Sequence, residues 1–145
     1  MITRRAVLIN GASAALISGS GLAAYVQGPG TAGAREPWKA AKTSLGDPRL
    51  DALAYAILAP NPHNRQPWMF ELVGETEINV FCDLERRLEH ADPIDRQIVI
   101  GFGCMLGLLE IAARERGYEA VITPFPDGEP QPRLDRRREA HVRIE

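Results

Sequence analysis

An apolar segment in the second half of this 145-residue chain restricts its fold more than any other feature of the sequence. Residues 98–109 contain no charged or strongly polar side chain. Asp92 as a cap and Pro93 at the first position predict that this segment lies in a helix over 93–116, which ends at Gly117. The apolar part is too short to cross a bilayer, which takes about 20 residues. A helix that is apolar on every side is expected to be buried on every side, so we predict a central helix surrounded by protein.

The segments around this helix predict an α+β fold. Asp47 and Pro48 mark the start of a first helix over 48–59, in which apolar residues recur on one face. Alternating apolar residues predict a β-hairpin over 68–82. Beyond the central helix we expect a strand over 118–124, a loop over 126–139 and a strand over 140–144. So few elements do not cover the central helix, and we expect either a second chain on it or a longer fold of which this sequence is a part.

The first 34 residues have the order of a bacterial export signal. The paired arginines Arg4 and Arg5 precede an uncharged run over 6–34, which is diluted by glycine and serine and ends in Ala-Gly-Ala. We therefore expect a twin-arginine signal peptide over 1–34, a linker or arm over 35–46, and a periplasmic protein that meets the membrane only through this signal. The alternative is an uncleaved membrane anchor, which the dilution with glycine and serine disfavours.

Charge and cysteine content exclude several classes of function. Without Arg4 and Arg5, 15 basic residues face 19 acidic ones, so no electrostatic surface for nucleic acid is expected. Cys82 and Cys104 each lie in an apolar run, which is typical of structural thiols, with a disulfide as the alternative. The histidines and cysteines have no metal-ligand spacing, and we expect no metal site.

The polar segment between the first helix and the hairpin is the candidate for chemistry. We name residues 60–67 the amide loop. Three prolines restrict its backbone, and its other side chains are amides and bases, in the order Asn61, His63, Asn64, Arg65 and Gln66. Amides between prolines are also common as plain turn residues.

The amide loop resembles a motif of the flavin-binding nitroreductase family, Pro-Ser-Ser-x-Asn-x-Gln-Pro-Trp, which follows the first helix in that family. The matching residues are Pro60, Asn64, Gln66, Pro67 and Trp68, whereas Asn61 and Pro62 stand at the two serine positions. Residues 92–97, followed by Ile100, Gly101 and Gly103, are similar to the Acg-type branch, whose FMN-binding oxidoreductase-like members often carry a twin-arginine signal.

This resemblance implies a nitroreductase-like α+β fold with a mixed sheet around a buried central helix. Residues 47–145 would be its N-terminal part, incomplete in this chain. The family binds FMN between two nitroreductase units and transfers hydride from NAD(P)H to nitro-aromatic or quinone-like acceptors. The expected partners are therefore a small-molecule electron acceptor and either a second copy of the chain or a missing second half.

The resemblance also implies roles for the amide loop. Asn64 and Gln66 offer the donors and acceptors that match the pyrimidine edge of a flavin, and Asn61 and His63 reach the ribityl chain or the ring edge. Arg65 would neutralise phosphate or the reduced ring. Trp68 is interpreted as core, with flavin stacking as the alternative. No catalytic residue is assigned.

Two departures from the family pattern keep other functions open. The start of the first helix, over 44–49, lacks the family's Arg-x-Ser-x-Arg-like phosphate site, and the basic pair of the family's C-terminal region has no counterpart in this chain. The first alternative is a non-catalytic module that binds or stores flavin. The second is an interaction protein without flavin.

Overall fold

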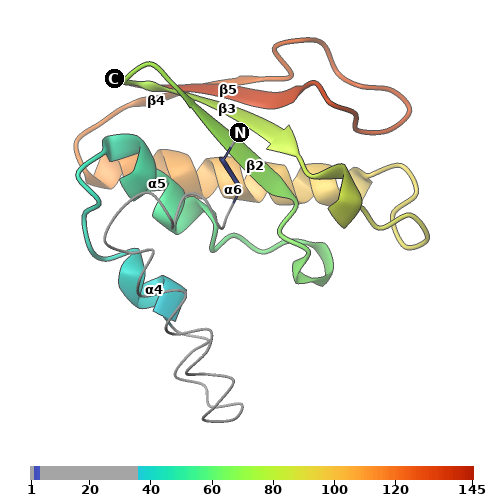
Figure 1. Cartoon of the computed structure of the whole chain (residues 1–145), viewed down its shortest axis with the longest axis horizontal. Coiled ribbons are helices and arrows are strands. Elements are labelled where there is room, and N and C mark those ends of the chain that lie inside the picture. Colours follow the sequence, from blue (N-terminus) through green and yellow to red (C-terminus); the bar gives the residue numbers. More distant parts are fainter. Residues whose placement is uncertain (1, 4–35) are drawn as a thin grey trace.

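The computed structural model of the chain describes residues 2–3 and 36–145 (Figure 1). The predicted export signal lies outside the described residues, apart from the backbone of a two-residue strand, β1 (Ile2–Thr3), which pairs with β2. A short helix, α4 (Glu36–Ala40), lies within the predicted linker. The other elements are α5 (Pro48–Ala56), η1 (Pro62–Asn64), β2 (Trp68–Val73), β3 (Glu77–Cys82), η2 (Leu84–Arg86), α6 (Arg96–Glu115), β4 (Ala120–Pro124) and β5 (Arg138–Ile144).

The strands form one sheet in the order β1-β2-β3-β5-β4, and every pair in it is antiparallel. The predicted hairpin is present as β2 and β3. The mixed sheet expected from the resemblance is not seen in the described part. Helix α6 connects β3 to β4, which run parallel to each other, but β5 lies between them and pairs antiparallel with both. The α+β class is therefore observed, without a parallel pair in contact.

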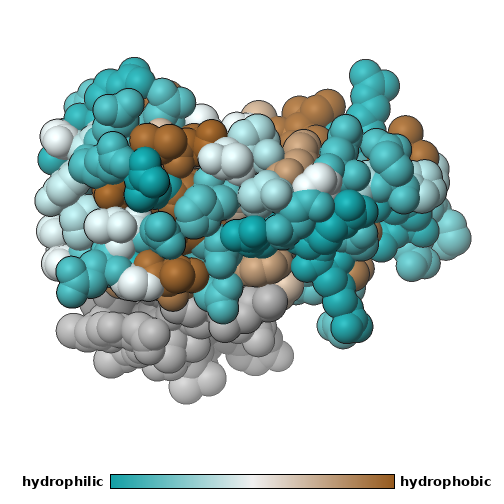
Figure 2. Space-filling view, turned by 90° about the horizontal axis from the view of Figure 1, so that it is seen from above, coloured by the Kyte–Doolittle hydropathy of each residue, from teal (hydrophilic) through white to brown (hydrophobic). Residues whose placement is uncertain are grey.

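Helices α5 and α6 pack on each other and cover one face of the sheet (Figure 1). On β2 and β3 the buried side chains alternate, and the rings of Trp68 and Phe102 of α6 form a T-shaped pair with centroids 6.0 Å apart. The core formed in this way includes Leu53, Ile57, Phe70, Ile78, Val80, Ile98, Met105, Leu109 and Val142. The surface in Figure 2 is mostly hydrophilic, with apolar groups in separate patches.

The helix starts follow the predicted caps with one shift, and α5 ends at Ala56 instead of the predicted residue 59, with Ile57 as its C-cap. Asp47 caps α5 by accepting a hydrogen bond from the Arg49 backbone N–H, as predicted. Asp92 also caps α6, but its Oδ2 accepts from Gln97 N and Ile98 N at 2.8 and 3.0 Å. The helix therefore begins at Arg96 instead of 93, because the chain first passes through Asp95 in the left-handed region, at φ 57°. At the other end, Gly117 terminates the helix at φ +83°.

The prediction that α6 is buried on every side is not met by the described residues. Ile98, Met105 and Leu109 are fully buried against the sheet and α5, whereas Ile100 and Ile111 on the opposite side are 57% and 55% exposed. By length and composition α6 is apolar enough to cross a membrane, a test that the core helix of a soluble protein also passes. Apolar residues lie on every side of α6, but the described elements pack against one side of it only.

Candidate functional site

The backbone of the amide loop is held in an uncommon conformation. His63, Asn64 and Gln66 all lie in the left-handed region, with φ between 49° and 54°. This region is sparsely populated by residues other than glycine, and it persists where surrounding contacts enforce it. Asn61 supplies such contacts, since its Oδ1 accepts from Gln66 N at 2.7 Å and its Nδ2 donates to Ala59 O at 3.2 Å. The loop is therefore a fixed structure.

The amide side chains leave one buried acceptor without a donor. Gln66 is only 7% exposed, and its Nε2 donates to Asn64 Oδ1 at 2.7 Å. Its Oε1 is buried and has no hydrogen-bond partner within the described residues. A buried carbonyl oxygen without a donor costs about 1 to 3 kcal/mol. This oxygen is therefore a candidate acceptor for an N–H group of a ligand.

The side chains of His63, Asn64 and Arg65 face outward. The Arg65 guanidinium donates to Arg86 O at 3.0 Å and to Glu85 O at 3.2 Å, and Arg86 returns a hydrogen bond to Arg65 O. These contacts attach the amide loop to η2. His63 and Asn64 are exposed, and Trp68 at the end of the loop is buried in the core. The structure thus brings together all five candidate residues in one loop, with Gln66 and Asn61 on its inner side.

The amide loop rests on α6 at Gly101. A Cβ at this position would lie 3.3 Å from Asn61 Cβ and 3.4 Å from Pro62 Cδ. Ile100, the preceding residue, is exposed, so the loop borders the uncovered side of α6. Gly103, two residues further on, has no described atom within 4 Å of such a Cβ.

Leucine at Gly101 is expected to displace the amide loop and to lower the free energy of unfolding by about 1 to 3 kcal/mol, because the added side chain has no space. Leucine at Gly103 is the matched control, and its better helix propensity is expected to raise stability by up to about 1 kcal/mol. Urea unfolding followed by fluorescence measures both. Equal effects of the two substitutions would show that the loop does not rest on Gly101.

A second polar group, absent from the sequence predictions, lies where α6 begins. Asp95 is fully buried, and its carboxylate accepts from Arg87 Nε at 3.1 Å and from Leu134 N at 3.0 Å. Arg87 also donates to Leu134 O at 3.4 Å, and Arg133 Nε lies 3.8 Å from the same carboxylate. We name Asp95, Arg87, Arg133 and Leu134 the Asp95 cluster. It fastens the loop 125–137 to the start of α6.

Glu139 on β5 is the second buried carboxyl group that sequence patterns did not indicate. It is 3% exposed, and neither of its oxygens has a hydrogen-bond partner in the described part of the chain. Burial raises the pKa of Glu139 to about 7, and the charges of Asp135 and Asp95 act in the same direction, against Arg137. The prediction of a loop over 126–139 is wrong at its end, because β5 begins at Arg138 and includes Glu139. No pattern in the sequence marks Glu139 as buried.

The cysteines are both free. Burial, together with the charges of Glu139 and Asp95, raises the pKa of the buried Cys82 thiol, so this thiol stays protonated and unreactive. Cys104 is partly buried on α6. The disulfide alternative is therefore not observed. Among residues 36–145, no group of three or more histidine, cysteine or acidic side chains is placed to hold a metal ion.

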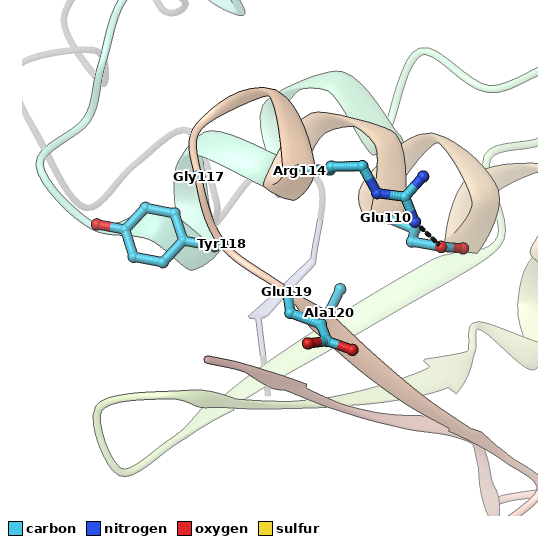
Figure 3. A pocket seen from close by; sticks show the side chains of 6 residues that line it. All are labelled: Glu110, Arg114, Gly117, Tyr118, Glu119 and Ala120. Carbon is cyan, nitrogen blue, oxygen red and sulfur yellow. Dashed lines mark hydrogen bonds and ion pairs between the residues drawn. The ribbon is translucent and has the colours of Figure 1, made fainter.

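A surface hollow of about 410 Å³ lies at the other end of α6 (Figure 3). It is open to solvent, and one side of it carries the ion pair of Arg114 with Glu110, at 2.6 Å. The Tyr118 ring points away from this pair in Figure 3. The hollow is far along α6 from the amide loop, at Gly101, and it has no buried polar group that indicates a ligand.

Comparison with known proteins gives partial matches. No family model matches the chain. A stretch of 75 residues, 52% of the chain, is 32% identical to "Putative NAD(P)H nitroreductase Rv3131" of Mycobacterium tuberculosis (strain ATCC 25618 / H37Rv) and covers 22% of that relative. From the same strain, "Uncharacterized protein Rv3127" is 33% identical over 79 residues, 23% of its length, and "Putative NAD(P)H nitroreductase acg" is 30% identical over 76 residues, also 23%.

These matches support a relationship between half of this chain and nitroreductases that are named for NAD(P)H. The observed α+β fold, with its antiparallel sheet and covering helices, is compatible with a part of such a protein. The chain spans less than a quarter of the length of each of these relatives.

Proposed function

We propose that this chain is an FMN-dependent oxidoreductase of nitroreductase type, exported by the twin-arginine route to the periplasm. It would take hydride from NAD(P)H and reduce nitro-aromatic or quinone-like acceptors. The observation that carries the proposal is the amide loop, a strained and fixed segment in which the buried Gln66 Oε1 has no donor among the described residues. The names of the partial relatives support the same class of reaction.

The residues of the amide loop fit the polar edge of a flavin. Gln66 Oε1 would accept a ring N–H, and this contact would remove the cost of a buried carbonyl oxygen without a donor. Asn64, Asn61 and His63 would bind the rest of the ring edge or the ribityl chain. When bound, FMN supplies the hydride chemistry, and the loop supplies binding and orientation.

The phosphate of FMN needs cations that the start of α5 does not offer. The Arg49 guanidinium is paired with Asp47 at 2.7 Å and donates to Gly74 O at 2.8 Å, so it holds the hairpin turn. Arg65 would have to leave the carbonyl oxygens of η2 to bind phosphate. We infer that a second nitroreductase unit supplies the missing cations, as a second copy of the chain or as a missing second half.

The uncovered side of α6 is the surface on which we place this second unit. Ile100 and Ile111 are both more than half exposed on it, and Gly103 and Gly107 have no described atom within 4 Å of an added Cβ. Among the described residues this side is thus apolar and free of steric obstruction, and it borders the amide loop. A flavin held by that loop would lie next to the second unit.

Flavin binding by the purified full chain tests the proposal. We expect a yellow protein with about one FMN per chain, and a dimeric mass by light scattering on the same sample. Gln66→Met is expected to weaken FMN binding by about 10- to 100-fold, since one hydrogen bond to a buried group is lost. Gln97→Met, an exposed amide at the start of α6, is the control and should bind FMN like the wild type.

The outcomes separate the alternatives. A protein that binds FMN but does not oxidise NAD(P)H with any nitro-aromatic or quinone acceptor would be a flavin-binding or storage module. A folded, colourless protein that ignores added FMN would refute the flavin proposal and leave an interaction protein. Equal FMN affinity of Gln66→Met and wild type would remove Gln66 from the site.

A further inference from the structure

A β-bulge turns Glu139 into the interior. Val80 pairs with Ala140 and Phe81 pairs with Arg138, so Glu139 is an extra residue of β5 between these pairs. As a result, Glu139 and Ala140 are both buried, which interrupts the alternation along the strand. The bulge thus places a carboxyl group in the core, where neither oxygen finds a partner among the described residues. Burying an ionised carboxylate without a partner is costly.

The charges around Glu139 increase this cost. Asp135 of the loop 125–137 and Asp95, the residue before α6, carry charges of the same sign as an ionised Glu139. Arg137 has the opposite sign, but its guanidinium forms two short hydrogen bonds with Asp135, at 2.8 and 3.0 Å. The neighbour on β3 is the Cys82 thiol, which stays protonated. The interior therefore favours a neutral Glu139.

The loop that follows β4 is fastened by the same carboxylate that repels Glu139. Leu134, which is 5% exposed, donates its backbone N–H to Asp95 and accepts from Arg87. Arg133 is held close to the same carboxylate, and its Nε and Nη2 are buried without hydrogen-bond partners in the described part. Glu139 lies two residues beyond Arg137, at the end of this loop. Movement of Glu139 out of the bulge would therefore pull on the loop contacts with Asp95 and Arg87.

We propose that Glu139 is a proton-controlled switch for the loop 125–137. With a neutral Glu139, the loop stays bound to Asp95 and Arg87 through Leu134. When Glu139 releases its proton to solvent, the charged carboxylate turns out of the bulge to water, and Leu134 leaves the Asp95 cluster. The raised pKa of Glu139, about 7, places this change near neutral pH.

The switch lies next to the contacts that hold the amide loop. Arg87 of the Asp95 cluster directly follows Arg86, which exchanges hydrogen bonds with Arg65. Release of Leu134 frees one of the two groups to which Arg87 donates. The conformation of residues 85–87 is thus the physical link between the switch and the amide loop.

The amide signal of Leu134 in the ¹⁵N-labelled full chain reports the switch. Between about pH 5.5 and 8.5 we expect this signal to lose the downfield shift of its hydrogen bond to Asp95, with a midpoint near pH 7. E139Q should abolish the transition, because a neutral amide has no proton to release. E129Q removes an exposed carboxylate of the same loop and should keep the transition. The chain's histidines are unchanged in both variants.

Two further variants test the switch if E139Q does not fold. D135N removes a repelling charge and frees Arg137 to attract Glu139, so the midpoint should move to lower pH. D127N, whose partner is Arg138, is the control and should leave the midpoint unchanged. A Leu134 signal that stays constant over the pH range in the wild type, or a midpoint that E139Q does not remove, would overturn the proposal.

Discussion

Replacing Asp95 with asparagine is expected to lower the free energy of unfolding by about 3 to 5 kcal/mol, the largest effect expected for a single substitution in this chain. The carboxylate is fully buried. It accepts hydrogen bonds from Arg87 and from the Leu134 backbone N–H, and it lies 3.8 Å from the Arg133 guanidinium. Its removal leaves the Arg87 guanidinium, which is 14% exposed, without a counter-charge. Asparagine adopts the left-handed backbone of this position readily, so the substitution changes charge without adding strain.

Urea unfolding of the wild type and D95N at the same pH, about 6, measures this effect. E110Q is the matched control, because the Glu110–Arg114 pair is exposed and is expected to contribute less than about 1 kcal/mol. The double variant R87M/D95N should recover part of the loss, since it removes the unpaired charge as well. Similar stabilities of D95N and E110Q would mean that the Asp95 cluster does not hold the loop.

Local patterns in the sequence were sufficient for most elements. Three of these patterns depend on contacts within a few residues: the cap at Asp47, the alternation through 68–82 and the helix end at Gly117. The structure confirms the start of α5, the hairpin of β2 and β3, and the end of α6 that they predicted. The start of α6 shifted because Asp92 caps it from a distance of five and six residues, through a turn that includes Asp95. A cap and a proline alone do not reveal such a turn.

The burial of α6 could be predicted only in part. Its apolar run indicated a buried helix, but composition does not say which protein covers which side. The sheet and α5 cover Ile98 and Met105, and the side with Ile100 remains exposed in this chain. Hydrophobicity therefore predicted that protein packs on α6, but not which protein. For the side with Ile100 we have proposed a second nitroreductase unit.

The buried polar contacts could not be predicted from the sequence, for a different reason. The hydrogen bond between Leu134 and Asp95 joins residues 39 positions apart, and no periodicity encodes such a contact. Glu139 is buried by a bulge, which breaks the period of two on which strand predictions depend. By contrast, the amide loop was recognisable because its residues are contiguous, and the structure adds its left-handed backbone and the unpaired Gln66 oxygen.

The second large effect is expected from E139Q, which should stabilise the protein above neutral pH by up to about 3 kcal/mol. The pKa of Glu139 is about 7 in the folded chain, above its ordinary value of 4.5. Between these two values the folded state binds more protons than the unfolded state. The stability that the neutral carboxyl provides is therefore fully present below about pH 4.5 and is lost as the pH rises through about 7. Glutamine stays neutral, so its contribution does not change with pH.

Urea unfolding of the wild type, E139Q and the control E129Q at about pH 5, 6, 7 and 8 measures this difference. The stability gap between E139Q and wild type should widen with pH, whereas E129Q should follow the wild type. A gap that stays constant would contradict the raised pKa. The size of the gap also bears on the switch, because opening of the loop 125–137 lets the charged Glu139 reach water. With either a closed or an open loop, the gap levels off once Glu139 of the folded chain is ionised, above about pH 7. If the loop opens, the charged Glu139 reaches water and the gap levels off at a smaller value than it does with a closed loop.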